Sequence, residues 1–226
     1  MPGNHHLYVP GPSNVPAAVQ QAIHCPMEDH RNPTIPGLIT PLVEDLKKIV
    51  LTEKGKVVFF PSSGTGCWEA ALQSTLNIGD TVLGASFGQF SMLWLDMCTR
   101  LQFKAITMDE EWGTGANPEI TRQKLLADKK HESKGVLVTH NETSTGIKSR
   151  VEEIRQAIDE TNHPALFMVD TISSLGSYNY DHQKWKVDVT VGGSQKGLML
   201  PPGMSFNAIS PKALEAYKNS KMPKSY

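Results

Sequence analysis

The stretch Val187-Asp-Val-Thr-Val-Gly-Gly-Ser-Gln-Lys196-Gly-Leu-Met-Leu-Pro-Pro-Gly203 decides the fold class. Its first half carries valines at alternate positions, which predicts a buried strand that Gly192 and Gly193 break. Lys196 follows in a glycine-flanked turn, where partial burial would lower the pKa of its amine and make it a nucleophile toward a carbonyl carbon. An ordinary lysine in a surface loop is the alternative, and this stretch alone favours it.

A second stretch, Pro164-Ala-Leu-Phe-Met-Val-Asp-Thr-Ile-Ser-Ser-Leu-Gly176, is an apolar run of strand length that leads to Asp170. An acid at the carboxyl end of a buried strand is unfavourable unless it has a cationic partner. A pyridinium nitrogen is such a partner. Enzymes that use pyridoxal 5'-phosphate (PLP) hold it through a lysine Schiff base and balance its ring nitrogen with an aspartate. Asp170 and Lys196 fit these two roles, so PLP is the predicted cofactor.

A glycine-rich turn upstream supplies a candidate phosphate site. A strand over 57–60 is followed by Pro61-Ser-Ser-Gly-Thr-Gly-Cys67, which opens a helix to about Leu76. Free N–H groups and the positive dipole end of that helix favour an anion. The pattern alone is weak, because it is neither a Walker A loop nor a full dinucleotide fingerprint.

Strands and helices alternate along the chain, which predicts an α/β fold with a mostly parallel seven-stranded sheet and helices on both faces. We expect strands over 57–60, 80–83, 103–108, 134–140, 164–170, 187–191 and 204–209. We expect helices over 17–23, 38–51, 64–76, 118–128, 151–161 and from 211, and one that carries Phe87, Phe90 and Trp94.

Four motifs together resemble the class V aminotransferases, and within them the alanine–glyoxylate and serine–glyoxylate enzymes. They are Val9-Pro-Gly-Pro12, His140-Asn-Glu-Thr-Ser-Thr-Gly146, Val169-Asp-Thr-Ile-Ser-Ser-Leu-Gly176 and Gly193-Ser-Gln-Lys-Gly-Leu198. The resemblance implies the large domain of a fold type I PLP-dependent transferase. It also implies a homodimer that moves an amino group from serine or alanine to glyoxylate. A cysteine desulfurase or lyase of the same class, or a PLP-fold fragment without catalysis, are the alternatives.

Residue roles follow from the same resemblance. It implies catalytic roles for Lys196 and Asp170; further cofactor contacts by Thr65, Gly66, Cys67, Phe87, Thr143, Ile172 and Gln195; and substrate contacts by Pro10 and Arg31. For Phe87 the alternative is a core residue, and for Arg31 a surface arginine. We expect Glu142 to anchor its loop rather than to bind a ligand.

The domain division expected from the resemblance is an N-terminal arm over 1–20 and a PLP-binding large domain over 21–226. The family continues into a C-terminal small domain that we expect this chain to lack. No arginine follows Arg155, although a substrate carboxylate usually meets an arginine of that small domain. We therefore expect the 226-residue chain to be an incomplete catalyst.

Composition narrows the binding partners and cellular locations to be expected. A formal net charge of −1 gives no electrostatic reason to expect nucleic acid or an anionic membrane as a partner. The three widely spaced cysteines predict reduced thiols in an intracellular protein, and no metal-ligand spacing occurs around them. No signal peptide or membrane span is expected. A cytoplasmic location is therefore predicted, or a peroxisomal one in a eukaryote.

Overall fold

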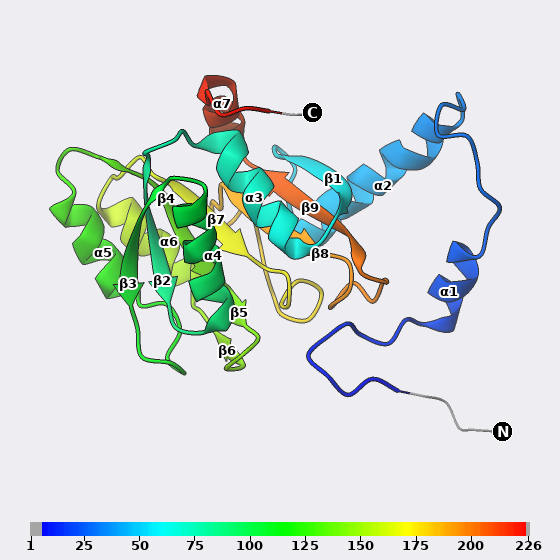
Figure 1. Ribbon diagram of the computed structural model, residues 1–226, viewed down its shortest axis with the longest axis horizontal. Coiled ribbons are helices and arrows are strands. Elements are labelled where there is room, and N and C mark those ends of the chain that lie inside the picture. Colours follow the sequence, from blue (N-terminus) through cyan, green and yellow to red (C-terminus); the bar gives the residue numbers. More distant parts are fainter. Residues whose placement is uncertain (1–5, 225–226) are drawn as a thin grey trace.

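The computed structural model describes residues 6–224, so the ends of the predicted arm and domain, 1–5 and 225–226, lie outside the described residues. Helices cover both faces of one central sheet, and an N-terminal segment runs away from this body (Figure 1). The predicted α/β class is confirmed. Where the sequence predicts where a helix or strand begins or ends, the observed residue differs by no more than three positions.

The main sheet has seven strands in the order β1-β9-β8-β7-β4-β2-β3. Their bounds are β1 Lys56–Ser62, β2 Thr81–Ser86, β3 Lys104–Asp109, β4 Ser133–Thr139, β7 Leu166–Asp170, β8 Val189–Gly193 and β9 Gly203–Ile209. Strand β9 is antiparallel to both β1 and β8, while β8, β7, β4, β2 and β3 pair in parallel. The sheet is therefore mostly parallel, as predicted.

A small hairpin after β4 was not predicted. Strand β5, Asn141–Glu142, pairs with β6, Ile147–Lys148, in antiparallel register. Two residues per strand carry no readable alternation, so periodicity could not reveal this hairpin.

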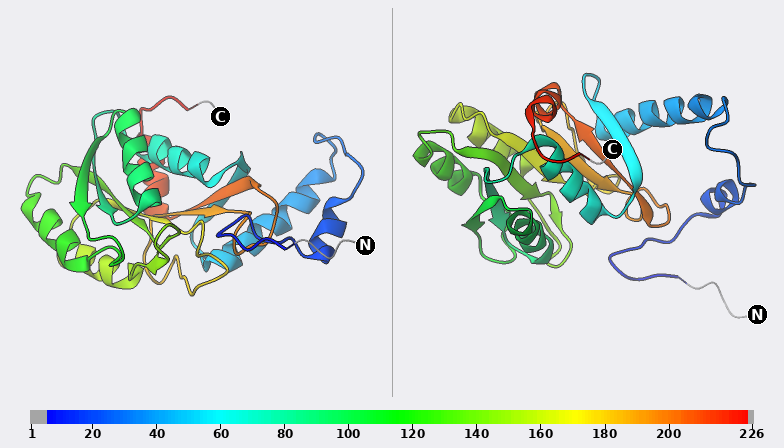
Figure 2. Two further views of the ribbon diagram at one scale, coloured as in Figure 1. Left: turned by 60° about the horizontal axis from the view of Figure 1, so that its bottom comes forward. Right: turned by 45° about the horizontal axis from the view of Figure 1, so that its top comes forward.

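The helices divide between the two faces of the sheet (Figure 2). One face is covered by α3 Gly64–Thr75, α4 Gln89–Arg100 and α7 Pro211–Asn219, and the other by α2 Ile35–Val50, α5 Pro118–Ala127 and α6 Val151–Glu160. Helix α1, Ala17–Ile23, lies on the N-terminal segment and has no buried residue. Among residues 6–224 no helix combines the length and the apolar character that crossing a bilayer requires.

Strand β7 shows how the sequence builds two cores. All five of its residues are buried. Leu166 and Met168 belong to the cluster beneath α3, α4 and α7, whereas Phe167 and Val169 belong to the cluster beneath α2, α5 and α6. A strand that is apolar at every position is typical of a parallel sheet covered on both faces.

The expectation that glycines break the strand before Lys196 is wrong. Gly192 and Gly193 are the last two residues of β8 and pair with Phe206 and Ser205 of β9. A Cβ at Gly192 would lie 2.2 Å from Cζ of Phe206. Glycine is therefore required at Gly192 because the Phe206 ring packs directly over the backbone, and not because the strand ends.

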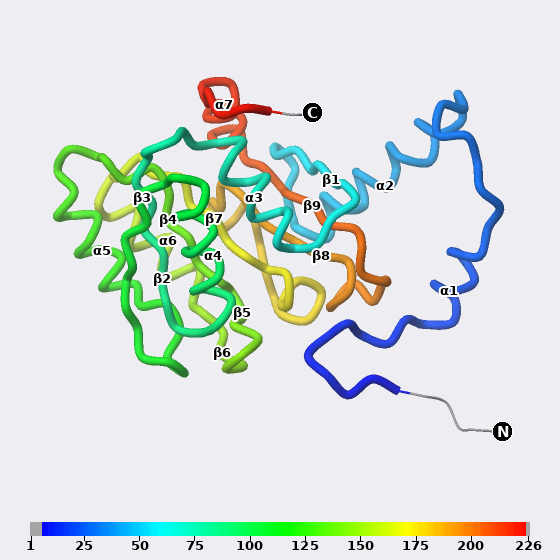
Figure 3. The backbone as a smooth tube through the Cα atoms, viewed as in Figure 1, coloured from blue at the N-terminus to red at the C-terminus, as the bar shows by residue number. Residues whose placement is uncertain are grey.

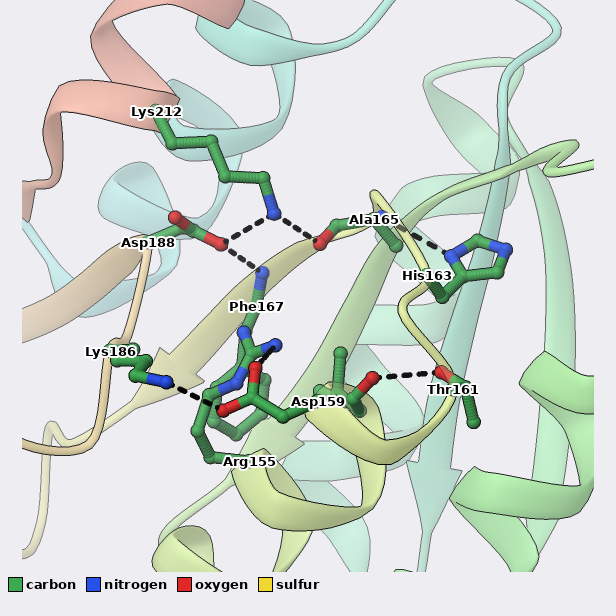
Figure 4. Close-up of polar contacts among 10 residues, drawn as sticks. Arg155, Asp159, Thr161, His163, Ala165, Phe167, Lys186, Asp188 and Lys212 are labelled. Atoms are coloured by element: carbon green, nitrogen blue, oxygen red, sulfur yellow. Dashed lines mark hydrogen bonds and ion pairs between the residues drawn. The ribbon is translucent and has the colours of Figure 1, made fainter.

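At the opposite, amino edge of the sheet, buried Asp188 joins β7 to α7 (Figure 4). Its carboxylate accepts hydrogen bonds from the Phe167 N–H at 2.9 Å, the Ser210 hydroxyl at 2.8 Å and the Lys212 amine at 3.3 Å. Lys212 also donates to the Ala165 carbonyl at 2.8 Å. This edge is consequently fixed by a satisfied polar network.

We predict that Asp188→Ala lowers the free energy of unfolding by about 3 kcal/mol. The change leaves the buried Phe167 N–H without an acceptor and removes the carboxylate partner of Lys212. The matched control is Lys186→Ala, which breaks the exposed ion pair to Asp159 seen in the same view. That change should remove less than about 1 kcal/mol. Urea unfolding measures both, and equal effects would contradict the assignment.

Candidate active site

Five chain segments meet at the carboxyl edge of the sheet (Figure 3). The β1–α3 turn, the β2–α4 turn, the β5–β6 hairpin, the end of β7 and the turn after β8 all leave the sheet there, because their strands run in the same direction. Open α/β sheets bind ligands at this edge. The topology thus brings together most of the residues that the sequence nominated.

Asp170 is the last residue of β7 and is 4% exposed. Burial is the main cause that raises the pKa of its carboxyl, to about 7, and the charge of Glu142 adds to this. The Ile172 N–H, at 2.7 Å from Oδ1, and the Lys196 charge oppose the rise. The carboxylate form is therefore held at an energetic disadvantage that a cation would relieve.

Trp68 of α3 lies next to Asp170 and was not nominated from the sequence. Its indole Nε1 is buried and makes no hydrogen bond of acceptable geometry with a described residue. The indole N–H nevertheless approaches the Asp170 carboxyl closely enough to lower its pKa. This indole N–H is therefore an available donor beside the carboxyl. The only sequence signal was an apolar residue on the buried face of α3.

Lys196 lies in the turn after β8 and is half-buried. Burial lowers the pKa of its amine, while the charge of Asp170 opposes that shift. The amine donates a hydrogen bond of 2.7 Å to the carbonyl oxygen of Pro10. Lys196 is therefore a partly desolvated amine close to a buried acid, as the sequence predicted.

The β1–α3 turn has the geometry of an anion cup. A Cβ at Gly66 would lie 1.9 Å from Oγ of Ser62, so a larger residue there would force the Ser62 hydroxyl to move. Helix α3 begins at Gly64, and the N–H groups of Gly66 and Cys67 donate to the Ser63 carbonyl. The N–H groups of Gly64 and Thr65 come before these bonds and have no acceptor within the helix.

Cys67 contributes to this turn differently from Thr65. Thr65 is exposed at the mouth of the turn, whereas Cys67 is fully buried. Burial raises the pKa of the Cys67 thiol to about 12, so the side chain is a neutral packing group at physiological pH. Any phosphate contact by Cys67 would have to come from its backbone, and that role stays a prediction.

Ile172 connects the cup to the lysine turn. A Cβ at Gly64 would lie 2.2 Å from its Cδ1, and one at Gly193 would lie 3.4 Å from its Cγ2. Gln195, half-buried, stands beside Lys196, and its carbonyl accepts from the Ser13 N–H at 2.9 Å. Both residues thus lie at the predicted edge, and their contact with a cofactor stays a prediction.

Thr143 begins the turn of the β5–β6 hairpin and is half-buried. The neighbouring Glu142 holds this turn: its carboxylate accepts from the N–H groups of Phe90 and Ser91 and from the N–H and hydroxyl of Ser144, at 2.8–3.3 Å. Glu142 is therefore a structural anchor between the hairpin and the N-terminus of α4, as expected.

Phe87 lies in the β2–α4 turn at this edge of the sheet, whereas Arg31 lies on the N-terminal segment. Phe87 precedes α4 rather than lying on it, and it is 0% exposed within the core. The core alternative fits this position, and stacking on a cofactor stays a prediction. Arg31 is exposed on the segment between α1 and α2, which lies away from the sheet in each view (Figure 2).

His140 is a further buried group, which opens one of the four motifs but has no predicted role. It is 1% exposed, its Nδ1 lies 2.9 Å from the Ser174 hydroxyl, and its N–H donates to the Asp170 carbonyl. Burial lowers the pKa of the His140 ring to about 4, with a smaller effect from Lys148, so the ring is neutral at physiological pH. Its hydrogen bonds tie the end of β4 to the end of β7 and to the turn that follows.

The residues at this edge fit PLP. The fit rests on three chemical features: a buried carboxyl whose charge is only partly compensated, a partly desolvated amine, and free N–H groups at the start of α3. These match a ring cation, an aldehyde and a phosphate. No group of three or more His, Cys, Asp or Glu side chains suited to a metal occurs among residues 6–224.

Comparisons with known proteins show which family the chain resembles. A sequence model described as aminotransferase class-V matches residues 36–223. Serine–glyoxylate aminotransferase of Methylorubrum extorquens is 52% identical over 215 residues, covering 95% of this chain and 54% of that protein. L-aspartate–glyoxylate aminotransferase of Paracoccus denitrificans is 42% identical over 226 residues, covering 100% and 57%.

Among solved structures, alanine–glyoxylate aminotransferase from Nostoc sp. superposes with a TM-score of 0.89 at 28% identity. The match covers 100% of this chain and 59% of that one. It confirms the predicted fold class. The chain spans about half the length of the curated relatives it matches.

We predict that Asp170→Asn stabilises the cofactor-free chain more at pH 8 than at pH 5. The folded state raises the pKa of this carboxyl from 3.8 to about 7, so wild-type stability falls as pH rises through that window. The amide cannot ionise, so its advantage should be roughly 3 kcal/mol larger at pH 8. Urea unfolding at both pH values measures it.

The control for this experiment is Asp45→Asn, at an exposed carboxyl of α2 that pairs with Lys48. Its effect should be small and similar at both pH values. Buried histidines titrate equally in wild type and variants and cancel in the comparison. An Asp170→Asn effect that is the same at pH 5 and pH 8 would show that the carboxyl is not destabilised by burial.

Proposed function

This chain belongs to the class V aminotransferase family, and we propose from that membership that it forms the cofactor-binding part of a PLP-dependent transaminase. The proposed reaction moves an amino group from serine to glyoxylate and yields hydroxypyruvate and glycine. The observation that supports it most is the convergence of Lys196, Asp170 and the cup at Gly64–Gly66 on one edge of the sheet.

Each of these groups has a distinct proposed role. Asp170 supplies the negative charge opposite the protonated ring nitrogen, which offsets the burial that raises its own pKa. The start of α3 holds the phosphate. Lys196 holds the cofactor and, once freed, moves the proton at the substrate Cα, for which a lowered amine pKa is suited. Bound PLP would supply the electron sink that makes this Cα–H acidic.

Arg31 is a proposed partner of the substrate carboxylate, beside the arginine that the resemblance places in the C-terminal small domain. The other four arginines, Arg100, Arg122, Arg150 and Arg155, form ion pairs with acids on their own helices. The Arg31 side chain makes no ion pair with any residue in 6–224. Because the α1–α2 segment extends away from the sheet of its own chain, we propose that Arg31 reaches the site of a second copy. Pro10, which contacts Lys196 of its own chain, is proposed to face the substrate in that chain's own site.

A second copy of the chain is the proposed partner. The N-terminal segment and α2 expose large apolar side chains: Tyr8 is 93% exposed, Met27 97% and Leu38 67%. Such surface is unfavourable in water and is typical of an interface. This exposure supports the homodimer inferred from the resemblance. The cytoplasmic location expected from the sequence stays a prediction.

We predict that Lys196 is the residue that binds PLP covalently. Incubating the chain with PLP, reducing with borohydride and mapping the peptides should place the pyridoxyl group on Lys196. Lys196→Ala should abolish the visible absorption and the label. The control is Lys54→Ala, at an exposed lysine of the loop before β1, which should leave both unchanged. A label on another lysine would rule out the proposed role.

For the donor we predict that serine reacts better than alanine or aspartate, with glyoxylate as the acceptor. Two relatives are named for serine and for L-aspartate, so a donor screen separates the branches. It is run with this chain and with any longer product of the same reading frame. Arg31→Gln should raise KM for serine by tenfold or more, because a buried carboxylate would lose its counter-charge.

The matched control for Arg31→Gln is Arg100→Gln, which removes an exposed arginine already paired with Asp96 and should leave KM unchanged. A screen in which aspartate or alanine works and serine does not would move the assignment to a sister activity. An unchanged KM in Arg31→Gln would exclude Arg31 as the carboxylate partner.

A further inference from the structure

We propose that Ser13 is a positioning residue that clamps the N-terminal segment across Lys196 and so holds the free amine on the carbonyl oxygen of Pro10. We call residues 9–13 the strap. The proposal rests on the function proposed above, because it concerns the amine that Lys196 uses there. It adds a residue that neither the four motifs nor the comparisons assign a role.

Three hydrogen bonds join Ser13 to the lysine turn. Its N–H donates to the Gln195 carbonyl at 2.9 Å, and its hydroxyl is shared between the carbonyls of Lys196 at 3.0 Å and Gln195 at 3.2 Å. Both acceptors are backbone carbonyl oxygens, one of Lys196 and one of the residue before it. Ser13 therefore fixes the strap relative to Lys196 itself, and not merely to the surface of the sheet.

The strap lies on a loop that is closed by its own side chain. Asn14 accepts from the Leu7 N–H at 2.8 Å and donates to the Leu7 carbonyl at 3.1 Å. Between these ends, Pro10 is exposed and its carbonyl faces the Lys196 amine at 2.7 Å. Because the loop closes locally, the Ser13 clamp orients Pro10 as one unit with the rest of the strap.

Gly11 makes the close approach possible. Its φ is +129°, and a Cβ there would lie 2.4 Å from Nζ and 2.5 Å from Cδ of Lys196. Any larger residue would occupy the place of the amine. The strap is thus shaped to leave room for one amine and to give that amine an acceptor.

The consequence is a defined resting position for the amine whenever it is not bonded to cofactor. The Pro10 carbonyl engages one N–H of the amine, and in the neutral amine the lone pair then points away from that acceptor. The strap also covers the amine and limits its hydration. Loss of the clamp should therefore expose Lys196 to reagents in water.

Trace acetylation of the cofactor-free chain tests the clamp. Acetic anhydride is the probe, and the rate at Lys196 is expressed relative to exposed Lys54, which serves as an internal reference. In Ser13→Ala this ratio should rise roughly fivefold, the change expected for one lost hydrogen bond. Ser13→Thr keeps a hydroxyl and should restore the ratio to near the wild-type value.

Thr34→Ala is the matched control, since it removes an exposed hydroxyl that makes no cap hydrogen bond before α2. Its ratio should equal that of wild type. An unchanged ratio in Ser13→Ala, a rise in Thr34→Ala as well, or no restoration by Ser13→Thr would each overturn the proposal. Unfolding curves confirm that the variants are folded.

This test is independent of the proposed function. If borohydride labelling failed to place PLP on Lys196 while the acetylation ratio responded to Ser13 alone, the clamp would stand and the cofactor role would fall. Labelling of Lys196 with PLP and an acetylation ratio that did not respond to Ser13 would rule out the clamp and leave the transaminase proposal intact.

Discussion

The unpaired charge of a buried carboxyl constrains the whole carboxyl edge of the sheet. Asp170 cannot be solvated where β7 ends, and burial in a low-dielectric site makes its ionised form unfavourable by several kcal/mol. Its surroundings compensate only partly, through the Ile172 backbone N–H and the nearby charge of Lys196. A site in this condition is prepared for a cation, which is the electrostatic basis for the proposed cofactor.

The amino edge of the same sheet shows the contrast. There the buried carboxylate of Asp188 has three donors, one of them a cationic amine, and it needs no ligand (Figure 4). Asp170 ends β7 and Asp188 immediately precedes β8, so the two aspartates lie at opposite edges of the sheet. Only Asp170, whose partners are incomplete, lies among free N–H groups and a partly desolvated amine. The amino edge of the sheet thus carries a buried carboxylate that stabilises the fold, and the carboxyl edge carries the one suited to bind a ligand.

Local chemistry was predictable from the sequence, and long-range placement was not. The strands, the Asp170 and Lys196 positions and the turn at Gly64–Gly66 follow from apolar runs and punctuation by glycine. The hairpin β5–β6 was too short to read, and the Gly192 prediction failed because only the fold reveals the Phe206 ring above it. The contact of Ser13 with Gln195 joins residues at opposite ends of the chain, and no local pattern encodes it.

Strand β9 has a consequence for how the chain can be made. It separates β1 from β8, so the strand that leads into the cup has β9 as its partner in the sheet, with Lys56 opposite Ile209. During synthesis β2, β4 and β7 can pair as they emerge, but β1 must wait until nearly the whole described chain has left the ribosome. Its unpaired edge, with Val58 and Phe60, is exposed to chaperones or wrong partners during that interval. Assembly of the cup is therefore a late, high-contact-order step that follows formation of the Asp170 end of the sheet.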